Sequence, residues 1–155
     1  MRMSERLMEL AGSLATSGGR SGTVRRRAVS TAYYALFHGL QELCADKFVG
    51  RDARRNPNYE IVYRSLEHGP TKDAFTRDPL RSHARIRLIG AVVIDLQGLR
   101  HKADYAPLAN LFNRRQCSQI IERARQSLFD LRHLDADDKL LLAVNLLFRA
   151  GKRSP

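Results

Sequence analysis

Apolar side chains recur along most of the chain at the three- and four-residue spacing of amphipathic helices, and no segment alternates as a strand would. The longest helical pattern runs from about Val24 to Phe48, and Gly50 follows it where a left-handed residue would close the helix. The pattern covers five segments, at about 5–17, 24–48, 85–106, 113–131 and 136–149. The sequence therefore predicts an all-α fold.

The ends of two segments carry capping signals. Ser4 is placed to cap the first helix, and Asp135 is placed to cap the last helix, which is expected to continue to Arg149. Five helices with mostly short connections favour an antiparallel, up-and-down bundle of about five helices. A chain of 155 residues suffices for one hydrophobic core, so we expect a single domain over residues 1–155 with a short basic tail at 150–155.

The segment from 51 to 82 has a different character. It begins with a charged loop, and residues 59–66 carry enough periodicity for two helical turns. Gly69-Pro70 is then interpreted as a break, and residues 71–82 show no clean periodicity. An irregular segment of this length inside a small domain is typical of a functional or mobile region.

The composition narrows the class of protein. No run approaches the roughly 18 apolar residues that cross a bilayer, and the start leads directly into an amphipathic pattern instead of a signal peptide. A cytoplasmic location without a membrane partner is therefore expected. Cys44 and Cys117 lie inside apolar helical stretches with no C-x-x-C spacing, so they are expected to fill the core.

The charge is strongly basic. Lys and Arg number 27 against 16 Asp and Glu, a formal net charge of +11, and most of the basic residues are Arg. Arg binds phosphate through planar, bidentate contacts, and a basic excess of this size favours polyanions, nucleic acid above all. The alternative is that the Arg content reflects a GC-rich genome and no partner.

Three clusters of polar residues do not fit a simple division of each helix into a buried apolar face and an exposed polar face. On the long helix, Arg27, Thr31, Tyr34 and His38 are spaced i, i+4, i+7 and i+11 and share one face. A basic, an aromatic and an imidazole group in this order suit a phosphate and a stacked base. The alternative is that Tyr34 and His38 only pack at the edge of the bundle.

The other two clusters lie at predicted helix ends. His68, before Gly69, is interpreted as the C-terminus of a short helix, where the dipole favours a cation. Arg100 and Asp104 lie four residues apart near the end of the helix that precedes Pro107, so they are placed to form an ion pair. A structural role explains both clusters as well as a functional one does.

Two of these blocks resemble a known family. Residues 26–38, RRAVSTAYYALFH, resemble the R-x-x-x-S-x-A-Y-Y-A-x-F-H helix of bacterial HEPN (higher eukaryotes and prokaryotes nucleotide-binding) domains. Residues 100–107, RHKADYAP, resemble the R-x-x-A-D-Y-x-P ending of one HEPN subgroup. The resemblance implies a HEPN-like helical bundle. It also implies a homodimer, and it implies a toxin–antitoxin ribonuclease with a nucleotidyltransferase-type antitoxin partner.

The sequence departs from the family's catalytic motif, R-x(4–6)-H, at its last position. Arg100 and the polar His101 match its start, but the expected histidine is replaced by Tyr105. A phenol, with a reference pKa of about 10, is a poor base at neutral pH. Catalysis would then need another histidine in the cleft. The candidate catalytic residues are Arg100, His101 and His38, and the candidate binding residues are Arg27, Tyr34, Asp104 and Tyr105.

Three hypotheses follow. The chain is a metal-independent endoribonuclease, or a degenerate relative that acts on RNA; it is a non-catalytic module that binds RNA, a nucleotide or a partner protein; or it is a structural dimerising bundle. The absence of a Gly-rich phosphate loop, and of any histidine spacing that suits a metal, predicts no cofactor and no metal. The apolar run Leu140–Leu142 is a candidate subunit contact.

Overall fold

The computed structural model describes residues 1–18, 20–107 and 110–148, and in that range its regular structure is entirely helical. The helices in this range are α1 (Met3–Ser17), α2 (Gly22–Phe48), α3 (Pro57–Tyr63), α4 (His68–Phe75), α5 (Ile86–Tyr105), α6 (Arg114–Arg132) and α7 (Ala136–Leu147). The predicted all-α class is confirmed. The expected number of about five helices was too low, because the described residues form seven.

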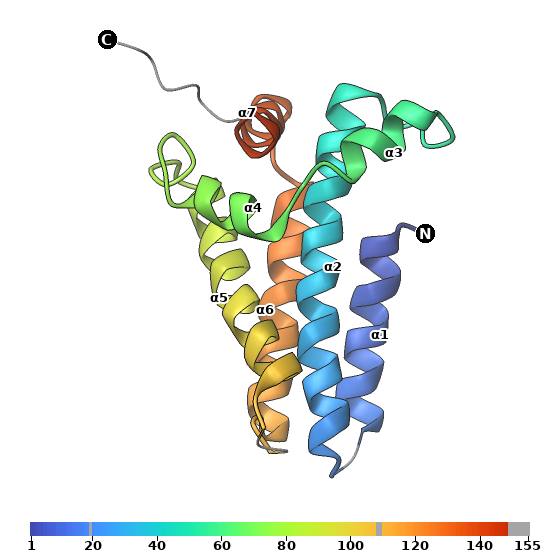
Figure 1. Ribbon diagram of the computed structural model, residues 1–155, viewed down its shortest axis with the longest axis vertical. Helices are drawn as coiled ribbons and strands as arrows, with labels where there is room; N and C mark the ends of the chain where they lie inside the picture. The colour runs from blue at the N-terminus through green and yellow to red at the C-terminus, as the bar shows by residue number, and fades with distance from the viewer. Residues whose placement is uncertain (19, 108–109, 149–155) are drawn as a thin grey trace.

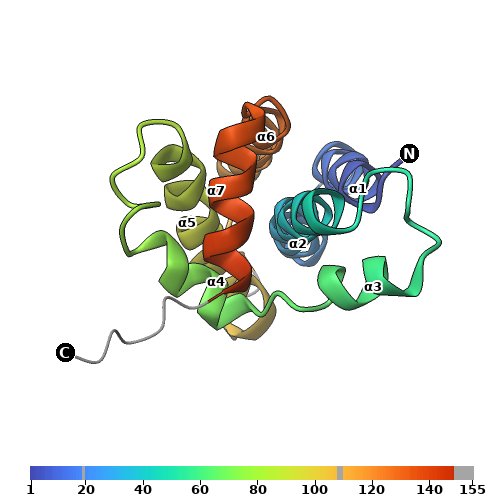
Figure 2. The same cartoon turned by 90° about the horizontal axis from the view of Figure 1, so that it is seen from above.

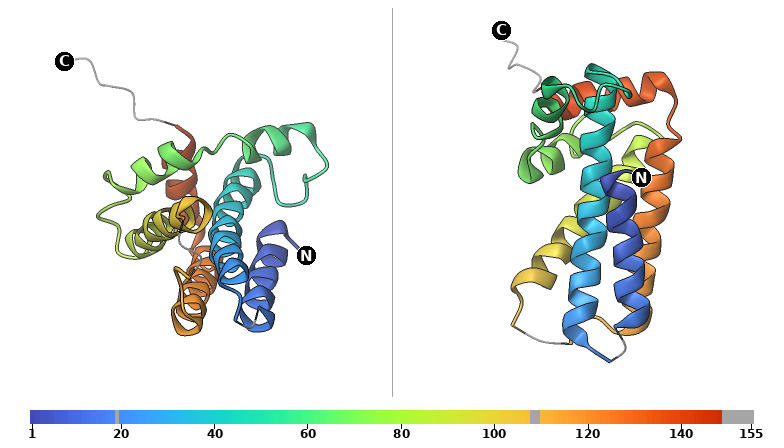
Figure 3. Two further views of the ribbon diagram at one scale, coloured as in Figure 1. Left: turned by 60° about the horizontal axis from the view of Figure 1, so that its bottom comes forward. Right: turned by 90° about the vertical axis from the view of Figure 1, so that its right-hand side faces the viewer.

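Four helices make the bundle. Helices α1, α2, α5 and α6 run along the long axis and alternate in direction, while α3, α4 and α7 gather at one end (Figure 1). Helix α7 lies across that end and runs from the end of α6 toward α4, between α5 and α2, as the view from above shows (Figure 2). The last predicted helix is therefore a cap on the bundle and not one of its long members. The side view in Figure 3 shows the same crossing.

Helix α2 lies at the centre of the bundle. It packs against α1, α3, α5, α6 and α7. Its fully buried side chains include Val29, Tyr33, Leu36 and Leu40, which join the core with residues from the surrounding helices. Cys44 and Cys117 are free and buried, as predicted.

The segment 51–82 contains two helices where one short helix was predicted. The interpretation of Gly69-Pro70 as a break was wrong, since both residues lie in the first turn of α4. Proline is tolerated there because the N–H groups of a first turn have no acceptor within the helix. His68 begins α4, so its predicted place at a helix C-terminus was also wrong.

The predicted helix ends are confirmed in two cases. The Asp135 side chain accepts a hydrogen bond from the Asp138 N–H at 2.8 Å, and Gly50 has a φ of 118° in the left-handed region. Ser4 does not cap α1, because the helix begins at Met3 and the Ser4 side chain is buried. The predicted continuation to Arg149 and the basic tail at 150–155 lie outside the described residues.

In the part of the chain that the structure describes, no helix is both long enough and apolar enough to cross a lipid bilayer.

Replacement of two glycines of α5 by alanine should have opposite effects on the free energy of unfolding. A Cβ at position 90 would lie 2.5 Å from Cδ1 of Phe75 and 3.0 Å from its Cβ, so Gly90→Ala should displace α4 and lower the free energy of unfolding by about 1–3 kcal/mol. A Cβ at position 98 meets no atom within 4 Å, so Gly98→Ala should raise the free energy of unfolding by about 0.5–1 kcal/mol through helix propensity. Urea unfolding followed by circular dichroism measures both. Equal effects of the two substitutions would contradict the close packing of α4 on α5.

Candidate functional site

A groove of about 430 Å³ lies between the N-terminal half of α2 and the C-terminal end of α5. It is lined by Thr23, Arg26, Arg27, Tyr34, Ala103, Asp104 and Tyr105, and we call it the α2–α5 groove. The structure thus brings together all four of the binding residues chosen from the sequence. Two come from one helix and two from another, about 70 residues later in the chain, and the packing of α2 on α5 joins them.

Arg26 forms the floor of this groove by closing the end of α5. Its Nε donates to the Ala103 carbonyl at 2.6 Å, and its Nη2 donates to the Ala106 carbonyl at 2.7 Å. The last carbonyls of a helix have no partner within the helix, so a guanidinium there satisfies them. Arg27, the next residue, is exposed and forms no ion pair with any described residue. Its charge is therefore available to a ligand.

Two aromatic rings and one carboxylate complete the groove. Tyr105 is exposed, at 69% of its full accessible area, and Tyr34 is half-buried. Asp104 also lines the groove and pairs with Arg100 at 3.6 Å, as its i, i+4 spacing predicted. Flat aromatic faces beside an exposed guanidinium are the arrangement that proteins use to bind single-stranded nucleic acid.

Arg100 lies behind the groove and does not line it. Its side chain is only 15% exposed, and its Cζ lies 5.4 Å from the ring centroid of Tyr33 and 5.8 Å from that of Tyr34. A guanidinium over aromatic faces is attracted by their electron-rich surfaces. The Nε is buried without a hydrogen-bond partner among the described residues. Arg100 is thus placed to hold Tyr34 and Asp104 in position.

His68 is a neighbour of Arg100 that the sequence analysis assigned to a helix end. Its Nδ1 lies 2.6 Å from the Tyr33 hydroxyl, and its ring stacks on Phe37 with centroids 4.1 Å apart. Burial lowers the pKa of His68, and the charges of Arg100 and His38 lower it further. Burial raises the pKa of Tyr33 well above its usual value, so the phenol keeps its proton.

The two histidines predicted for catalysis have other partners. His38 is hydrogen-bonded to the Tyr63 hydroxyl, and burial lowers its pKa while Glu42 opposes the shift. His101 is exposed and lies beside Tyr105, with ring centroids 4.9 Å apart. Within the described ranges, no hydrogen bond joins either histidine to Arg100, and neither lines the groove. Of the three histidines, His68 is the one whose pKa is lowered by the charge of Arg100.

Comparisons of the chain with protein-family models, curated proteins and solved structures found no match. The HEPN resemblance accordingly stays a prediction from the two sequence blocks. Among the described residues, no three His, Cys, Asp or Glu side chains gather as a metal site would need.

The lowered pKa of His68 predicts a stability that depends on pH. Because the folded chain binds this proton less readily than the unfolded chain, whose histidine has the ordinary value of 6.5, acid favours unfolding. The contribution is complete above about pH 6.5 and is lost as the pH falls below it. The free energy of unfolding should therefore drop between pH 7.5 and 5.5 by more in the wild type than in His68→Gln. An equal drop in the free energy of unfolding for the wild type and His68→Gln, measured by urea unfolding, would contradict this prediction.

Proposed function

We propose that this chain is a HEPN-like module that binds single-stranded RNA in the α2–α5 groove. The observation that carries the proposal is the convergence of Arg27, Tyr34, Asp104 and Tyr105 on one groove. Together these groups offer contacts for the phosphate, the base and the ribose of a nucleotide. The resemblance of residues 26–38 and 100–107 to HEPN blocks supports the same conclusion, because both blocks border the groove.

The chemistry of the groove matches RNA in three ways. The exposed Arg27 guanidinium donates to phosphate oxygens, and such contacts dominate nucleic-acid affinity. The rings of Tyr34 and Tyr105 offer stacking faces, and stacking on an aromatic side chain contributes about 1–3 kcal/mol per base. The Asp104 carboxylate accepts hydrogen bonds, and the ribose 2′-hydroxyl is the donor that distinguishes RNA from DNA.

The surroundings support binding more directly than catalysis. Arg100 contributes through Tyr34 and Asp104, so its own charge lies one layer away from a ligand in the groove. The net charge of +11 adds long-range attraction for a polyanion and speeds association. Tyr105 in place of the motif's histidine removes the base that the family's reaction would use, while it adds a second stacking face.

The RNA proposal predicts distinct effects of two exposed side chains. In a fluorescence-anisotropy titration with a short single-stranded RNA, Arg27→Ala should weaken binding and reduce the slope of log K against log salt by about 0.7, the value for one phosphate contact on a single strand. Tyr105→Ala should weaken binding by about tenfold or more with the salt slope unchanged, because stacking is lost and no charge is removed.

Matched controls are available on other faces. Arg87→Ala removes the same charge from an exposed position near the other end of α5, and Phe129→Ala removes an exposed ring from α6. Both should bind RNA as the wild type does. If Arg87→Ala weakens binding as much as Arg27→Ala, the affinity comes from net charge alone and the groove is not the site.

A second candidate function, metal-independent endoribonuclease, is favoured by one observation. Arg100 and His68 both lie against Tyr33, and the lowered pKa of His68 leaves its ring neutral, as a general base must be. In cleavage by a 2′-hydroxyl, His68 would take the hydroxyl proton, Arg100 would stabilise the charge that develops on the phosphorane, and the resulting imidazolium would return that proton to the leaving 5′-oxygen. For a phosphate to reach both Arg100 and His68, the Tyr34 ring would have to move away from Arg100.

This candidate predicts cleavage of total RNA in EDTA by the wild type and a loss of about 10²–10⁴ in rate for His68→Gln. Arg100→Ala should also lose activity, whereas His101→Gln should keep it, because His101 lies outside the Arg100 cluster. Gel analysis of the products over time measures all four proteins. No cleavage by the wild type, or equal cleavage by the wild type and His68→Gln, would reject the ribonuclease.

The partners implied by the resemblance are part of the proposal. A homodimer is supported by the exposed apolar side chains of α7 and the residue after it, namely Leu140, Val144 and Phe148. Leu142, in the run chosen from the sequence, is instead buried in the core. A nucleotidyltransferase-type antitoxin partner and a cytoplasmic location stay predictions from the resemblance and the composition.

A further inference from the structure

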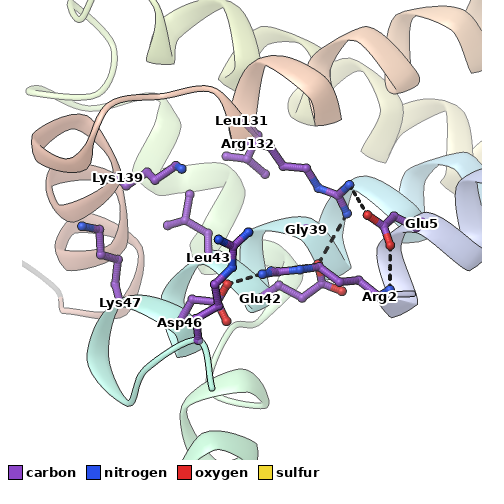
Figure 4. Close-up of a pocket in the computed structure, with 11 residues that line it drawn as sticks. Arg2, Glu5, Gly39, Glu42, Leu43, Asp46, Lys47, Leu131, Arg132 and Lys139 are labelled. Carbon is purple, nitrogen blue, oxygen red and sulfur yellow. Dashed lines mark hydrogen bonds and ion pairs between the residues drawn. The ribbon is translucent and has the colours of Figure 1, made fainter. Parts of the chain in front are cut away.

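A second cavity, of about 320 Å³, lies at the other end of α2, where α1, α2, α6 and α7 meet (Figure 4). We call it the α2–α7 pocket. Five cationic side chains and three carboxylates belong to its lining. The two cavities use different parts of α2: residues from Thr23 to Tyr34 line the α2–α5 groove, and residues from Gly39 to Lys47 line this pocket.

One side of the pocket is a network of ion pairs. Glu42, only 5% exposed, lies 3.8 Å from Arg2 and 3.9 Å from Arg132. Arg2 also pairs with Asp46 at 2.7 Å, and Arg132 pairs with Glu5 at 2.6 Å. Figure 4 shows this network on one side of the pocket. All three carboxylates of the lining are therefore occupied by two arginines.

The other side of the pocket carries three cations without a carboxylate partner. Lys47 lies in the last turn of α2, Arg51 follows that helix, and Lys139 lies in α7, and none of them forms an ion pair within the described residues. Figure 4 shows Lys47 and Lys139 on the same side of the pocket, with their side-chain nitrogens pointing in different directions. Burial lowers the pKa of Lys139, and the charges of Arg51, Lys47 and Arg2 lower it further, against an opposing effect of Asp46. The three cations thus repel one another in the absence of an anion.

We propose that the α2–α7 pocket binds a phosphate group through Lys47, Arg51 and Lys139. Three cations that line one cavity suit a dianionic phosphate, since each contributes a charge-assisted hydrogen bond and the anion removes their mutual repulsion. The carboxylates of the lining are each paired with Arg2 or Arg132, and its five cations outnumber its three carboxylates. The anion would join the end of α2 to α7 and so hold α7 across the bundle. The source is free phosphate or the terminal phosphate of a nucleotide.

The test is thermal unfolding and isothermal titration calorimetry of the full chain with inorganic phosphate, at an ionic strength matched with potassium chloride. Phosphate should raise the Tm of the wild type, because it binds the folded state alone. Lys139→Gln should raise the Tm in chloride, where it relieves repulsion, and should lose the phosphate response with affinity weakened by about tenfold or more. Arg51→Gln, at an exposed position, should lose the response without disturbing the core.

Two control variants remove a positive charge outside both sites. Lys72→Gln, on the exposed surface of α4, and Arg87→Ala, on the exposed surface of α5, should both keep the full phosphate response. Uridine 5′-monophosphate and uridine distinguish the sources: tighter binding of the monophosphate than of phosphate assigns a nucleotide end, and equal binding assigns free phosphate. Absence of a Tm increase in the wild type, or an unchanged response in both Lys139→Gln and Arg51→Gln, would overturn the proposal.

Discussion

The burial of α2 on all sides is the constraint from which the rest of the structure follows. Five other helices pack against α2, so a polar group on it meets protein more often than water. A buried polar atom without a partner costs about 1–3 kcal/mol, and α2 carries several buried polar side chains that need one. Glu42 is satisfied by Ser4, Tyr33 by His68, and Arg25 by the Phe112 carbonyl at 2.7 Å. These pairs tie the surrounding segments to α2.

Both sites arise where this covering is incomplete. Near the start of α2, the end of α5 leaves Arg27 and Tyr34 open to solvent, and Arg26 closes the helix terminus beneath them. Near the end of α2, α7 crosses the bundle and brings Lys139 opposite Lys47. The first site combines a cation with aromatic faces, and the second has five cations, three carboxylates and no aromatic ring in its lining. They therefore suit different parts of a nucleic acid, namely stacked bases and a phosphate.

The parts of this architecture that depend on neighbouring residues could be predicted from the sequence. Helical periodicity gave the long helices, and the Asp135 cap and the left-handed Gly50 were read correctly from residue type and position. The Arg100–Asp104 pair followed from i, i+4 spacing, and the shared face of Arg27 and Tyr34 followed from i, i+7 spacing.

The parts that depend on long-range packing could not. His68 and Tyr33 are 35 residues apart, and the packing of α4 on α5 and α7 makes them partners. Ser4 has the residue type of a helix cap, yet its hydroxyl donates to Glu42 at 2.6 Å, from a position 38 residues earlier in the chain. The α2–α7 pocket joins residues 2 to 139, and no local pattern signals it. Gly69-Pro70 was misread because proline breaks a helix in its interior but not in its first turn.

The most direct test of the central claim is photo-crosslinking of the full chain to a single-stranded RNA that contains 4-thiouridine, with the crosslinked residues mapped by mass spectrometry. The α2–α5 groove predicts crosslinks at Tyr34 and Tyr105, because these are the rings on which a base would stack. Crosslinks that fall on α6 or α4 and spare both tyrosines would contradict the groove as the RNA-binding site.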